Sequence, residues 1–513
     1  MNRRTFLIRC GETAALVASS KTAVAANTTA ELVLREAPNA PRIPLTYTGL
    51  SYELAQLSDP DFFSASNRAL VAHFRLLSPH GILRVGGNSS EFCWFKADAS
   101  TPEPTLHVPR GDLNSNWMPH QLFAIEPRAI DQLAGFLRAT NWRLIYGLNL
   151  GNSTPARAAT EAAYVASKIG PQLEYFQIGN EPDLYHNPTN GTRPSNWGFD
   201  DYVNDWSNFA RAILSKVPNA RFGGPDVASS SDWVVRFAES IPQELPNRIA
   251  ALTGHYYAEG PPDDPRVTIE RLLRPNPRIA ESMSRIEQIA KPRSLVYRMS
   301  EGNSCYRAGK PGLSNAFAAA LWGGDYMLQT ASLGCVGVNF HGGQSGFLTR
   351  ALGNHNPGLD SAKAPTKMHG GYYTPIQSEP GQPVRAMPVF YGMMLANQLA
   401  GGTMLACDLK TDVDATAYAA SHASSIILAL FNKDSGKSLD LSIRAPHPLR
   451  AARAWRLQAP SLDAIEGITL AGASIDDDHA RWTPTTTEKL NPSANSLDFH
   501  LPAASAALLF LNS

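Results

Sequence analysis

The stretch "LEYFQIGNEPDLY" (residues 173–185) is an apolar, strand-like run that ends abruptly in Gly179, Asn180, Glu181 and Pro182. Large β-branched and aromatic side chains bounded by Gly and Pro are typical of a buried strand. In parallel α/β folds the carboxyl end of such a strand is where chemistry is placed. The rest of the sequence must therefore show which sheet contains this strand and which chemistry its glutamate serves.

Seven further strand-like runs surround this one, and helical patterns alternate with them. The eight runs span residues 46–54, 81–88, 142–150, 173–181, 221–227, 249–258, 294–302 and 337–343. Helix-like segments lie between them, as at 126–140, 156–170 and 277–291, and another at 388–400 follows the last run. This alternation predicts a parallel sheet with crossover helices, and eight units fit a closed (β/α)8 TIM barrel over residues 46–398.

An open doubly wound sheet is the alternative architecture. Its dinucleotide-binding form carries a G-x-G-x-x-G loop after the first strand. The Gly-rich segment "RVGGNSS" (84–90) has a different spacing, so the barrel is favoured. After residue 398 the pattern changes to short strands separated by Gly, Asp, Asn and Ser turns, which predicts an all-β sandwich over 399–513. The segment 30–45 is expected to add a strand to that sandwich.

The N-terminus is typical of an export signal. Arg3-Arg4, a weakly apolar run and the small-residue stretch before Asn27 resemble a twin-arginine signal peptide over residues 1–26. We therefore expect a periplasmic or secreted protein. No later apolar run approaches the roughly 18 residues that span a bilayer, so no membrane association of the mature form is expected.

Charge and motif content exclude several other classes of protein. Lys+Arg and Asp+Glu number 45 each and no basic block is present, so nucleic acid is a poor candidate partner. The chain has no C-x-x-C and no H-E-x-x-H, so it shows no zinc site of familiar spacing. We expect neither a metal nor a cofactor.

Polar residues cluster at the ends of the expected barrel strands, and two of those ends contribute a glutamate. Glu181 ends the fourth strand and Glu301 ends the seventh. Two carboxyl groups across a barrel mouth suit glycoside hydrolysis, and a retaining mechanism needs them about 5–5.5 Å apart. The aromatic surroundings of Glu181 suit a protonated acid, whereas the polar neighbours of Glu301 suit an ionised nucleophile. A single such glutamate is often only a solvated rim residue, so the pair carries the inference.

Four longer motifs resemble glycoside hydrolase family 79, a family of retaining TIM-barrel enzymes that includes β-glucuronidases and heparanase. They are "RVGGNSSEF" (84–92), "FQIGNEPDLY" (176–185), "GHYYAEG" (254–260) and "SEGNSCYRAGKPGLSNAFAAALWGGDYM" (300–327). The resemblance covers about residues 46–398. It implies that Glu181 is the acid/base and Glu301 the nucleophile.

The same resemblance implies roles for further residues. Asn180 would bind the sugar 2-hydroxyl, and Tyr256 would hydrogen-bond the nucleophile. Asn88 and Glu53 would bind hydroxyls of the non-reducing sugar. His341, at the end of the eighth strand, is either a substrate contact or a rim residue that satisfies local hydrogen bonds.

A carboxylate pocket is implied just after the nucleophile. It would consist of Tyr306 and the backbone N–H groups of Arg307, Ala308 and Gly309, with Arg307 adding its charge. Heparanase-like sequences have glycines directly after the tyrosine, and this chain has Arg307-Ala308 there instead. In the long insertion at 344–386, Tyr373 or its neighbour Tyr372 would close over the carboxylate.

These observations predict a retaining exo-β-D-glucuronidase that acts on carbohydrates with a terminal β-glucuronic acid. The insertion at 344–386 would wall off one end of the cleft, and the neutral charge disfavours a long cationic cleft for a sulfated chain. Two alternatives keep the chemistry: an endo-acting, heparanase-like enzyme and a neutral-sugar β-glycosidase. A third, an exported carbohydrate-binding protein without catalysis, is disfavoured by the presence of both glutamates.

Overall fold

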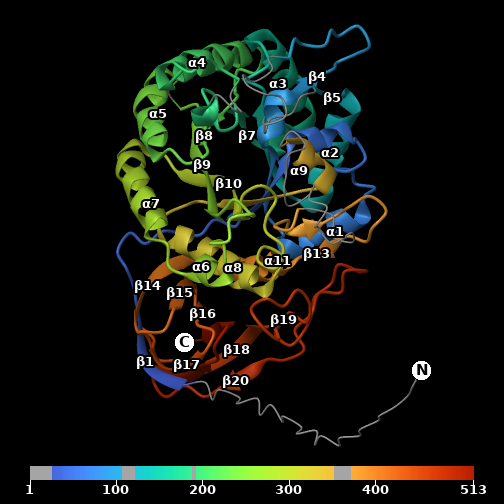
Figure 1. Ribbon diagram of the computed structural model, residues 1–513. Coiled ribbons are helices and arrows are strands. Elements are labelled where there is room, and N and C mark those ends of the chain that lie inside the picture. The colour runs from blue at the N-terminus through green and yellow to red at the C-terminus, as the bar shows by residue number, and fades with distance from the viewer. Residues whose placement is uncertain (1–25, 107–121, 188–191, 246, 352–370, 513) are drawn as a thin grey trace, which may run out of the picture.

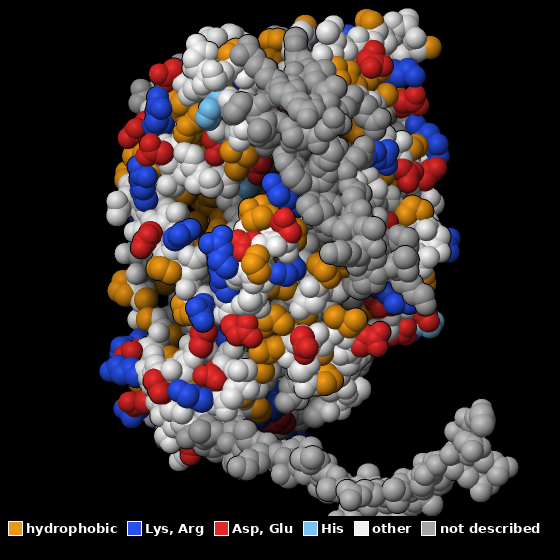
Figure 2. Space-filling model, in the orientation of Figure 1, with side chains coloured by type: hydrophobic (Ala, Val, Ile, Leu, Met, Phe, Trp, Pro, Cys, Tyr) orange, Lys and Arg blue, Asp and Glu red, His pale blue; other side chains and the backbone are white. Residues whose placement is uncertain are grey.

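The computed structural model describes residues 26–106, 122–187, 192–245, 247–351 and 371–512 (Figure 1). The expected signal peptide at 1–26 lies outside the described residues except for Ala26, and so do residues 352–370 of the insertion. Within these ranges, no helix combines the length and the apolar character that a membrane span needs. Figure 2 shows acidic and basic side chains interspersed over one face, in keeping with the neutral charge.

Eight parallel strands close into a barrel, so the predicted fold class is confirmed (Figure 1). The strands run around the barrel in chain order, and β9 pairs with β10 and β11 with β2. They are β2 (Thr48–Glu53), β3 (Ile82–Gly86), β6 (Arg143–Leu148), β7 (Leu173–Ile178), β8 (Phe222–Val227), β9 (Ile249–Glu259), β10 (Tyr297–Cys305) and β11 (Val338–Gly342). Each lies within or beside one of the eight runs expected from the sequence.

The helices form a layer around the barrel. Several begin at side chains that satisfy the free N–H groups of the first turn, as Thr154 and Ser230 do before α3 and α5. The helices are α1 (Arg68–Leu77), α2 (Pro127–Thr140), α3 (Pro155–Ile169), α4 (Phe199–Lys216), α5 (Ser231–Glu244), α6 (Ile269–Leu273), α7 (Pro277–Ala290), α8 (Phe317–Ser332), α9 (Ser345–Ala351) and α11 (Pro388–Asn397). Two short ribbons, β4 (Cys93–Phe95) with β5 (Phe123–Ile125) and β12 (Ile376–Gln377) with β13 (Arg385–Ala386), complete this part of the chain.

The C-terminal part folds into a ten-stranded sheet that encloses its own apolar core. Its strands are β14 (Thr403–Lys410), β15 (Ala415–His422), β16 (Ser425–Asn432), β17 (Lys437–Arg444), β18 (Ala451–Gln458), β19 (Thr469–Leu470), β20 (Glu488–Leu490), β21 (Ser496–Leu501), β22 (Ser505–Asn512) and β1 (Ala26–Arg35). Strand β1 lies between β14 and β17, and it begins four residues before the segment expected at 30–45. Leu32 of β1, Leu441 of β17 and Leu509 of β22 meet in the core.

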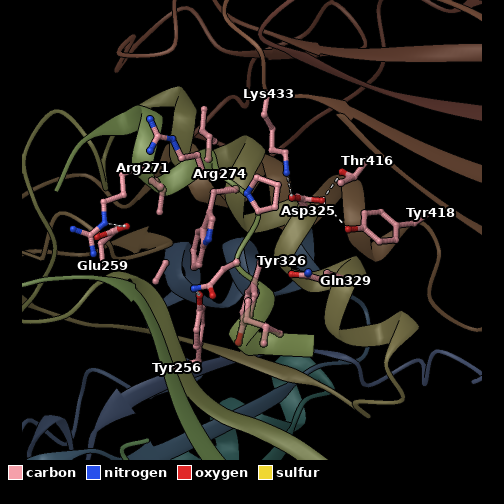
Figure 3. A pocket seen from close by; sticks show the side chains of 17 residues that line it. Tyr256, Glu259, Arg271, Arg274, Asp325, Tyr326, Gln329, Thr416, Tyr418 and Lys433 are labelled. Atoms are coloured by element: carbon pink, nitrogen blue, oxygen red, sulfur yellow. Dashed lines mark hydrogen bonds and ion pairs between the residues drawn. The ribbon is translucent and has the colours of Figure 1, made fainter. Parts of the chain in front are cut away.

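The barrel and the β-sheet domain meet along α8 and α11. These two helices pack so closely that a Cβ on Gly392 would lie 2.0 Å from the carbonyl oxygen of Ala320. Asp325 of α8 binds Lys433 at 2.8 Å and accepts hydrogen bonds from Thr416 and Tyr418 of β15 (Figure 3). Because Lys433 is buried, these contacts compensate a charge that would otherwise oppose the packing of the two domains.

Candidate active site

Glu181 projects from a sharply turned segment at the end of β7. Its backbone is left-handed (φ 49°), and Gly179, two residues earlier, also has a positive φ (86°). The Glu181 N–H donates to the carbonyl oxygen of Asp226 at 2.8 Å, which ties this turn to the end of β8. A non-glycine residue with positive φ is uncommon, and such strain concentrates at functional sites.

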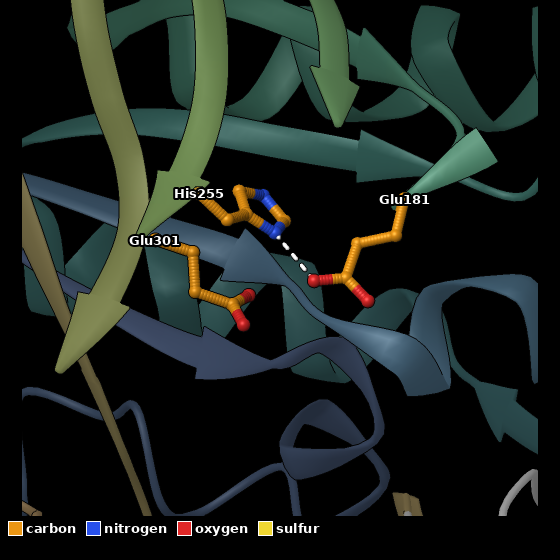
Figure 4. Close-up of side chains that lie close together, drawn as sticks. All are labelled: Glu181, His255 and Glu301. Atoms are coloured by element: carbon orange, nitrogen blue, oxygen red, sulfur yellow. Dashed lines mark hydrogen bonds and ion pairs between the residues drawn. The ribbon is translucent and has the colours of Figure 1, made fainter. Parts of the chain in front are cut away.

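Glu301 comes from β10 and lies opposite Glu181 across the barrel mouth (Figure 4). One carboxylate oxygen of Glu181, one of Glu301 and a ring nitrogen of His255 all lie within 4.8 Å of one another. This spacing fits the short separation of a nucleophile and an acid/base in retaining glycosidases.

Arg84, on β3, forms the floor beneath the two glutamates. Its Nη1 donates to Glu301 Oε2 at 2.6 Å, and its Nη2 donates to Asp226 Oδ2 at 2.6 Å. Nη2 also donates to Asn180 Oδ1 at 2.8 Å. The guanidinium is buried, so these charge-assisted bonds act at low dielectric and hold three side chains in fixed positions.

A tyrosine holds the other oxygen of Glu301, and it is Tyr257 rather than the expected Tyr256. Tyr257 OH donates to Glu301 Oε1 at 2.7 Å. The expectation for Tyr256 is therefore wrong: its hydroxyl accepts from Asn276 Nδ2 at 2.8 Å, and its ring stacks on Tyr326 with centroids 5.2 Å apart. Successive side chains on a strand point to opposite faces, so His255 and Tyr257 face the barrel mouth and Tyr256 faces the helix layer.

The environment of Glu301 favours its ionised form. Burial alone would raise its pKa, but the neighbouring His341, His255 and Arg84, together with the Tyr257 hydrogen bond, lower the pKa to about 2. A carboxylate held in this way is charged at any pH near neutrality. It is also aimed, because each oxygen has its own donor.

The environment of Glu181 favours its protonated form. Burial is the largest influence and raises its pKa, while the hydrogen bond and charge of His255 act in the opposite direction. His255 Nδ1 lies 2.9 Å from Glu181 Oε1, and its Nε2 lies 3.2 Å from Asp226 Oδ1 without hydrogen-bond alignment (Figure 4). Burial would lower the pKa of His255, but Asp226 and Glu301 raise it to about 10.

Among the described His, Cys, Asp and Glu side chains, one group comes close enough together to bind a metal ion. It consists of Glu181, His255 and Glu301. The raised pKa of His255 means that its ring carries both protons near neutral pH and offers no lone pair. The cluster is therefore better suited to proton transfer than to metal binding.

A cleft of about 620 Å³ opens above the two glutamates. Eight of the residues predicted from the sequence line it: Glu53, Asn88, Glu181, Glu301, Tyr306, Arg307, His341 and Tyr373. The other six lining residues were not among the predicted site residues. They are Tyr257 of β9, Leu348 of α9, Leu184 and Asn187 from the segment after β7, and Ala228 and Ser229 from the segment after β8.

Hydrogen bonds fix the polar residues on one side of this cleft. Asn180 Nδ2 donates to Asn88 Oδ1 at 3.1 Å. Glu53 Oε2 accepts from the N–H and the hydroxyl of Ser89 at 2.8 and 2.7 Å. His341 Nε2 lies 3.3 Å from Glu53 Oε1, so these side chains form one connected polar wall.

The loop after Tyr306 takes an unusual backbone conformation. Arg307, Ala308 and Gly309 have φ values of 59°, 65° and 89° in succession. A Cβ on Gly309 would lie 2.7 Å from the N–H nitrogen of Tyr373, so this position cannot carry a side chain without displacing its neighbour. The Ala308 side chain is buried against Leu348 and Tyr373, which leaves Tyr306 and Arg307 as the members of this loop that line the cleft.

Four buried polar residues outside the predicted set organise the site: Arg84, Glu91, Asp226 and His255. Glu91 accepts from the N–H groups of Leu150 and Asn180 at 2.9 and 2.8 Å, which fixes the ends of β6 and β7 side by side. An arginine or aspartate inside an otherwise apolar strand is a sequence signal that could have identified Arg84 and Asp226, because such charges are buried only when paired.

Comparisons of the sequence with known proteins identify two relatives. No model of a known protein family matches the chain. A β-glucuronidase of Aspergillus niger is 26% identical over 499 residues, covering 89% of this chain and 87% of the relative. A β-glucuronidase of Neurospora crassa is 29% identical over 341 residues, covering 59% of this chain and 58% of the relative.

The fold is that of TIM-barrel glycosidases. The solved structure of a 4-O-α-L-rhamnosyl-β-D-glucuronidase from Fusarium oxysporum superposes with a TM-score of 0.69 at 17% identity, covering 95% of this chain and all of that one. A GH51 arabinofuranosidase from Xanthomonas axonopodis superposes with a TM-score of 0.64 at 14% identity, covering 94% of this chain and all of that one.

Proposed function

We propose that this protein is a retaining exo-β-D-glucuronidase of the kind found in glycoside hydrolase family 79. The observation that carries the proposal is the pair Glu181 and Glu301, two close carboxyl groups whose surroundings favour opposite protonation states. Two β-glucuronidases among its relatives supply the substrate class. The protein would remove a terminal β-glucuronic acid from a glycan or glycoconjugate.

The residues divide a double displacement between them. Glu301, ionised and held by Arg84 and Tyr257, attacks the anomeric carbon while Glu181 gives its proton to the glycosidic oxygen, and the leaving group departs. The Glu181 carboxylate then takes a proton from water, the oxygen of that water attacks the anomeric carbon, and the bond to Glu301 breaks. The sugar keeps its configuration because it is inverted twice.

Recognition of the glucuronate carboxylate is assigned to the loop 306–309. Tyr306, Arg307 and Tyr373 all line the cleft, so a carboxylate bound between them would meet two hydroxyl donors and one cation. Glu53, Asn88 and Asn180 would bind ring hydroxyls on the opposite side. Export by a signal peptide over residues 1–26 remains part of the proposal, on the basis of Arg3-Arg4, the weakly apolar run and the small-residue stretch that follow.

The decisive experiment compares p-nitrophenyl β-D-glucuronide with the matching β-D-glucoside. A carboxylate bound by two or more charge-assisted hydrogen bonds is worth a few kcal/mol, so kcat/KM is expected to favour the glucuronide by about 100-fold or more. A ratio near one would instead indicate a neutral-sugar β-glycosidase. Release of internal oligosaccharides from heparan sulfate would indicate endo action.

Two variants test the mechanism separately from the substrate. Glu301→Gln should abolish turnover, because the amide cannot form the glycosyl-enzyme. Glu181→Ala should regain activity with azide on substrates with good leaving groups, because a small anion attacks the glycosyl-enzyme without base assistance. Proton NMR should show the β-anomer first. A first-formed α-anomer would exclude the double displacement, and absence of any hydrolysis would leave the carbohydrate-binding alternative.

A further inference from the structure

A second cavity lies beside the catalytic cleft, in the space between the barrel wall and the helix layer. It has a volume of about 340 Å³ and is bounded by β8, β9 and β10 on one side and by α5 and α7 on the other. Figure 1 shows α7 running alongside these strands. Its lining combines polar groups, among them His255, with an apolar set that consists of Val227, Val234, Ile279, Met283, Ile286 and Met299.

The second cavity reaches the surface, because the exposed Ser282 lines it, and its volume lies in the range of small-molecule sites. Ligand sites are typically about 300–1,000 Å³, mostly apolar, with a few polar groups that fix orientation. The second cavity meets this description, because Ser229, Asn276 and Arg278 also line it.

The second cavity shares part of its wall with the catalytic cleft. Ala228, Ser229 and Tyr257 line both spaces. The segment that carries Ala228 and Ser229 is bound to the acid/base turn, because their N–H groups donate to Asp183 at 2.9 and 3.3 Å. The two spaces therefore adjoin on the side of Glu181.

In a glycosidase the acid/base delivers its proton to the leaving-group oxygen, so the leaving group lies on the acid/base side. We propose that the second cavity binds the leaving group of the substrate, and that it takes an apolar ring system attached to the glucuronic acid. The apolar residues from β8, α5 and α7 would contact the ring, and Arg278 and Ser229 would bind a polar edge. This inference rests on the proposed glucuronidase function and specifies its leaving group.

Two serines on α7 give a matched pair of variants for the test. Ser282 and Ser284 are both exposed, and Ser282 lines the second cavity whereas Ser284 does not. A tryptophan at either position stays at the surface, so neither change threatens folding through the core. Ser282→Trp should obstruct the second cavity, and Ser284→Trp serves as the control.

The kinetic measurement is the ratio of kcat/KM for 2-phenylethyl β-D-glucuronide to that for methyl β-D-glucuronide, since both release simple alcohols. The ratio should be well above one for the wild type and should fall at least tenfold in Ser282→Trp. The Ser284→Trp variant should keep the wild-type ratio. An unchanged ratio in Ser282→Trp, or equal losses in both variants, would overturn the proposal.

A binding measurement separates this inference from the proposed function. Fluorescence titration with 2-naphthol needs no turnover, and it should show saturable binding that Ser282→Trp weakens at least tenfold. Absence of hydrolysis of every β-glucuronide, with naphthol binding intact, would reject the glucuronidase function alone. Glucuronidase activity without naphthol binding and with an unchanged kinetic ratio would reject the second cavity as a leaving-group site.

Discussion

Arg84 Nη1 and Glu301 Oε2 are 2.6 Å apart inside the barrel, and the arginine is fully enclosed. The contact joins a permanently charged donor to the carboxylate assigned as the nucleophile. The same guanidinium binds Asp226 through Nη2, so one side chain fixes two acidic groups that would otherwise repel each other. Together with the neighbouring His341 and His255, Arg84 explains why a buried carboxyl group can stay ionised here.

Replacing Arg84 by Gln should therefore reduce kcat by about 100-fold or more, the usual loss when one preorganised donor is removed from an active site. The acidic limb of the kcat/KM profile should move to higher pH, because the pKa of Glu301 is no longer lowered by the guanidinium. Steady-state kinetics from pH 3 to 9 measure both effects, because an acidic limb that lies below pH 3 in the wild type should enter this range in the variant.

Arg84→Lys is the control, because it keeps the positive charge but lacks the planar guanidinium whose two terminal nitrogens bind Glu301 and Asp226. It should restore the position of the acidic limb more fully than it restores kcat. If Arg84→Gln left the acidic limb where it is in the wild type, another group would have to hold Glu301 ionised. In Arg84→Gln, loss of the ion pair with Asp226 should also lower the free energy of unfolding by about 3–5 kcal/mol.

Tyr257 and Tyr256 provide a second test through adjacent residues of one strand. Tyr257→Phe removes the donor to Glu301 Oε1, and kcat should fall about 10- to 100-fold with a smaller change in KM. Tyr256→Phe removes only a hydroxyl that accepts from Asn276 on the outer side of the strand, so turnover of methyl β-D-glucuronide, whose leaving group is small, should change less than twofold. The reverse pattern would restore the assignment made from the sequence.

The sequence could identify Glu181 and Glu301 because each follows an apolar run directly, and strand ends meet at one face of a barrel. It could not choose between Tyr256 and Tyr257. Alternation shows that His255 and Tyr257 share a face, but which face that is depends on the register of β9 against β10. That register shifts between Met299 and Glu301, and such an irregularity has no signature in a single sequence.

The sequence could single out the buried charges beneath the glutamates, but it could not show which of them pair. Arg84 and Asp226 lie on β3 and β8, which are not neighbours in the barrel and are 142 positions apart in the chain. Each looks like an isolated charge in an apolar run, and only closure of the barrel brings them to 2.6 Å. The positive φ values of Arg307 and Ala308 could not be predicted either, because a positive φ is usually taken by glycine and neither residue is a glycine.

His255 is expected to set the pH range of activity. Its ring lies 2.9 Å from Glu181 and carries a positive charge near neutrality, so it lowers the pKa that burial raises. His255→Gln removes this charge, and the pKa of Glu181 should rise. The alkaline limb of kcat/KM should therefore move to higher pH, as long as Glu181 must be protonated in the free enzyme.

The acidic limb should move in the same direction, because His255 also lowers the pKa of Glu301. Arg84, Asp226 and Glu301 remain in the variant and keep the rest of the network charged. A downward move of the alkaline limb would instead mean that His255 is neutral and that its Nδ1 accepts a hydrogen bond from the protonated Glu181.

The last prediction concerns stability, through a carboxyl group remote from the reaction. Glu161 of α3 is buried, and its hydroxyl partner Tyr146 donates to it at 2.8 Å. Burial raises the pKa of Glu161 to about 7, and the Tyr146 hydrogen bond only partly offsets this. A raised carboxyl pKa stabilises the folded state below the unfolded pKa, and this stabilisation is lost as pH rises through the folded value. Glu161 should therefore lower stability by about 3 kcal/mol between pH 4.5 and pH 8. Glu161→Gln keeps the shape and an acceptor for Tyr146 but cannot ionise. Its Tm should match the wild type at pH 5 and exceed it by several degrees at pH 8, whereas the exposed Glu281→Gln should show no such divergence. Parallel Tm curves for Glu161→Gln and the wild type would show that Glu161 is already ionised in the folded protein at pH 5.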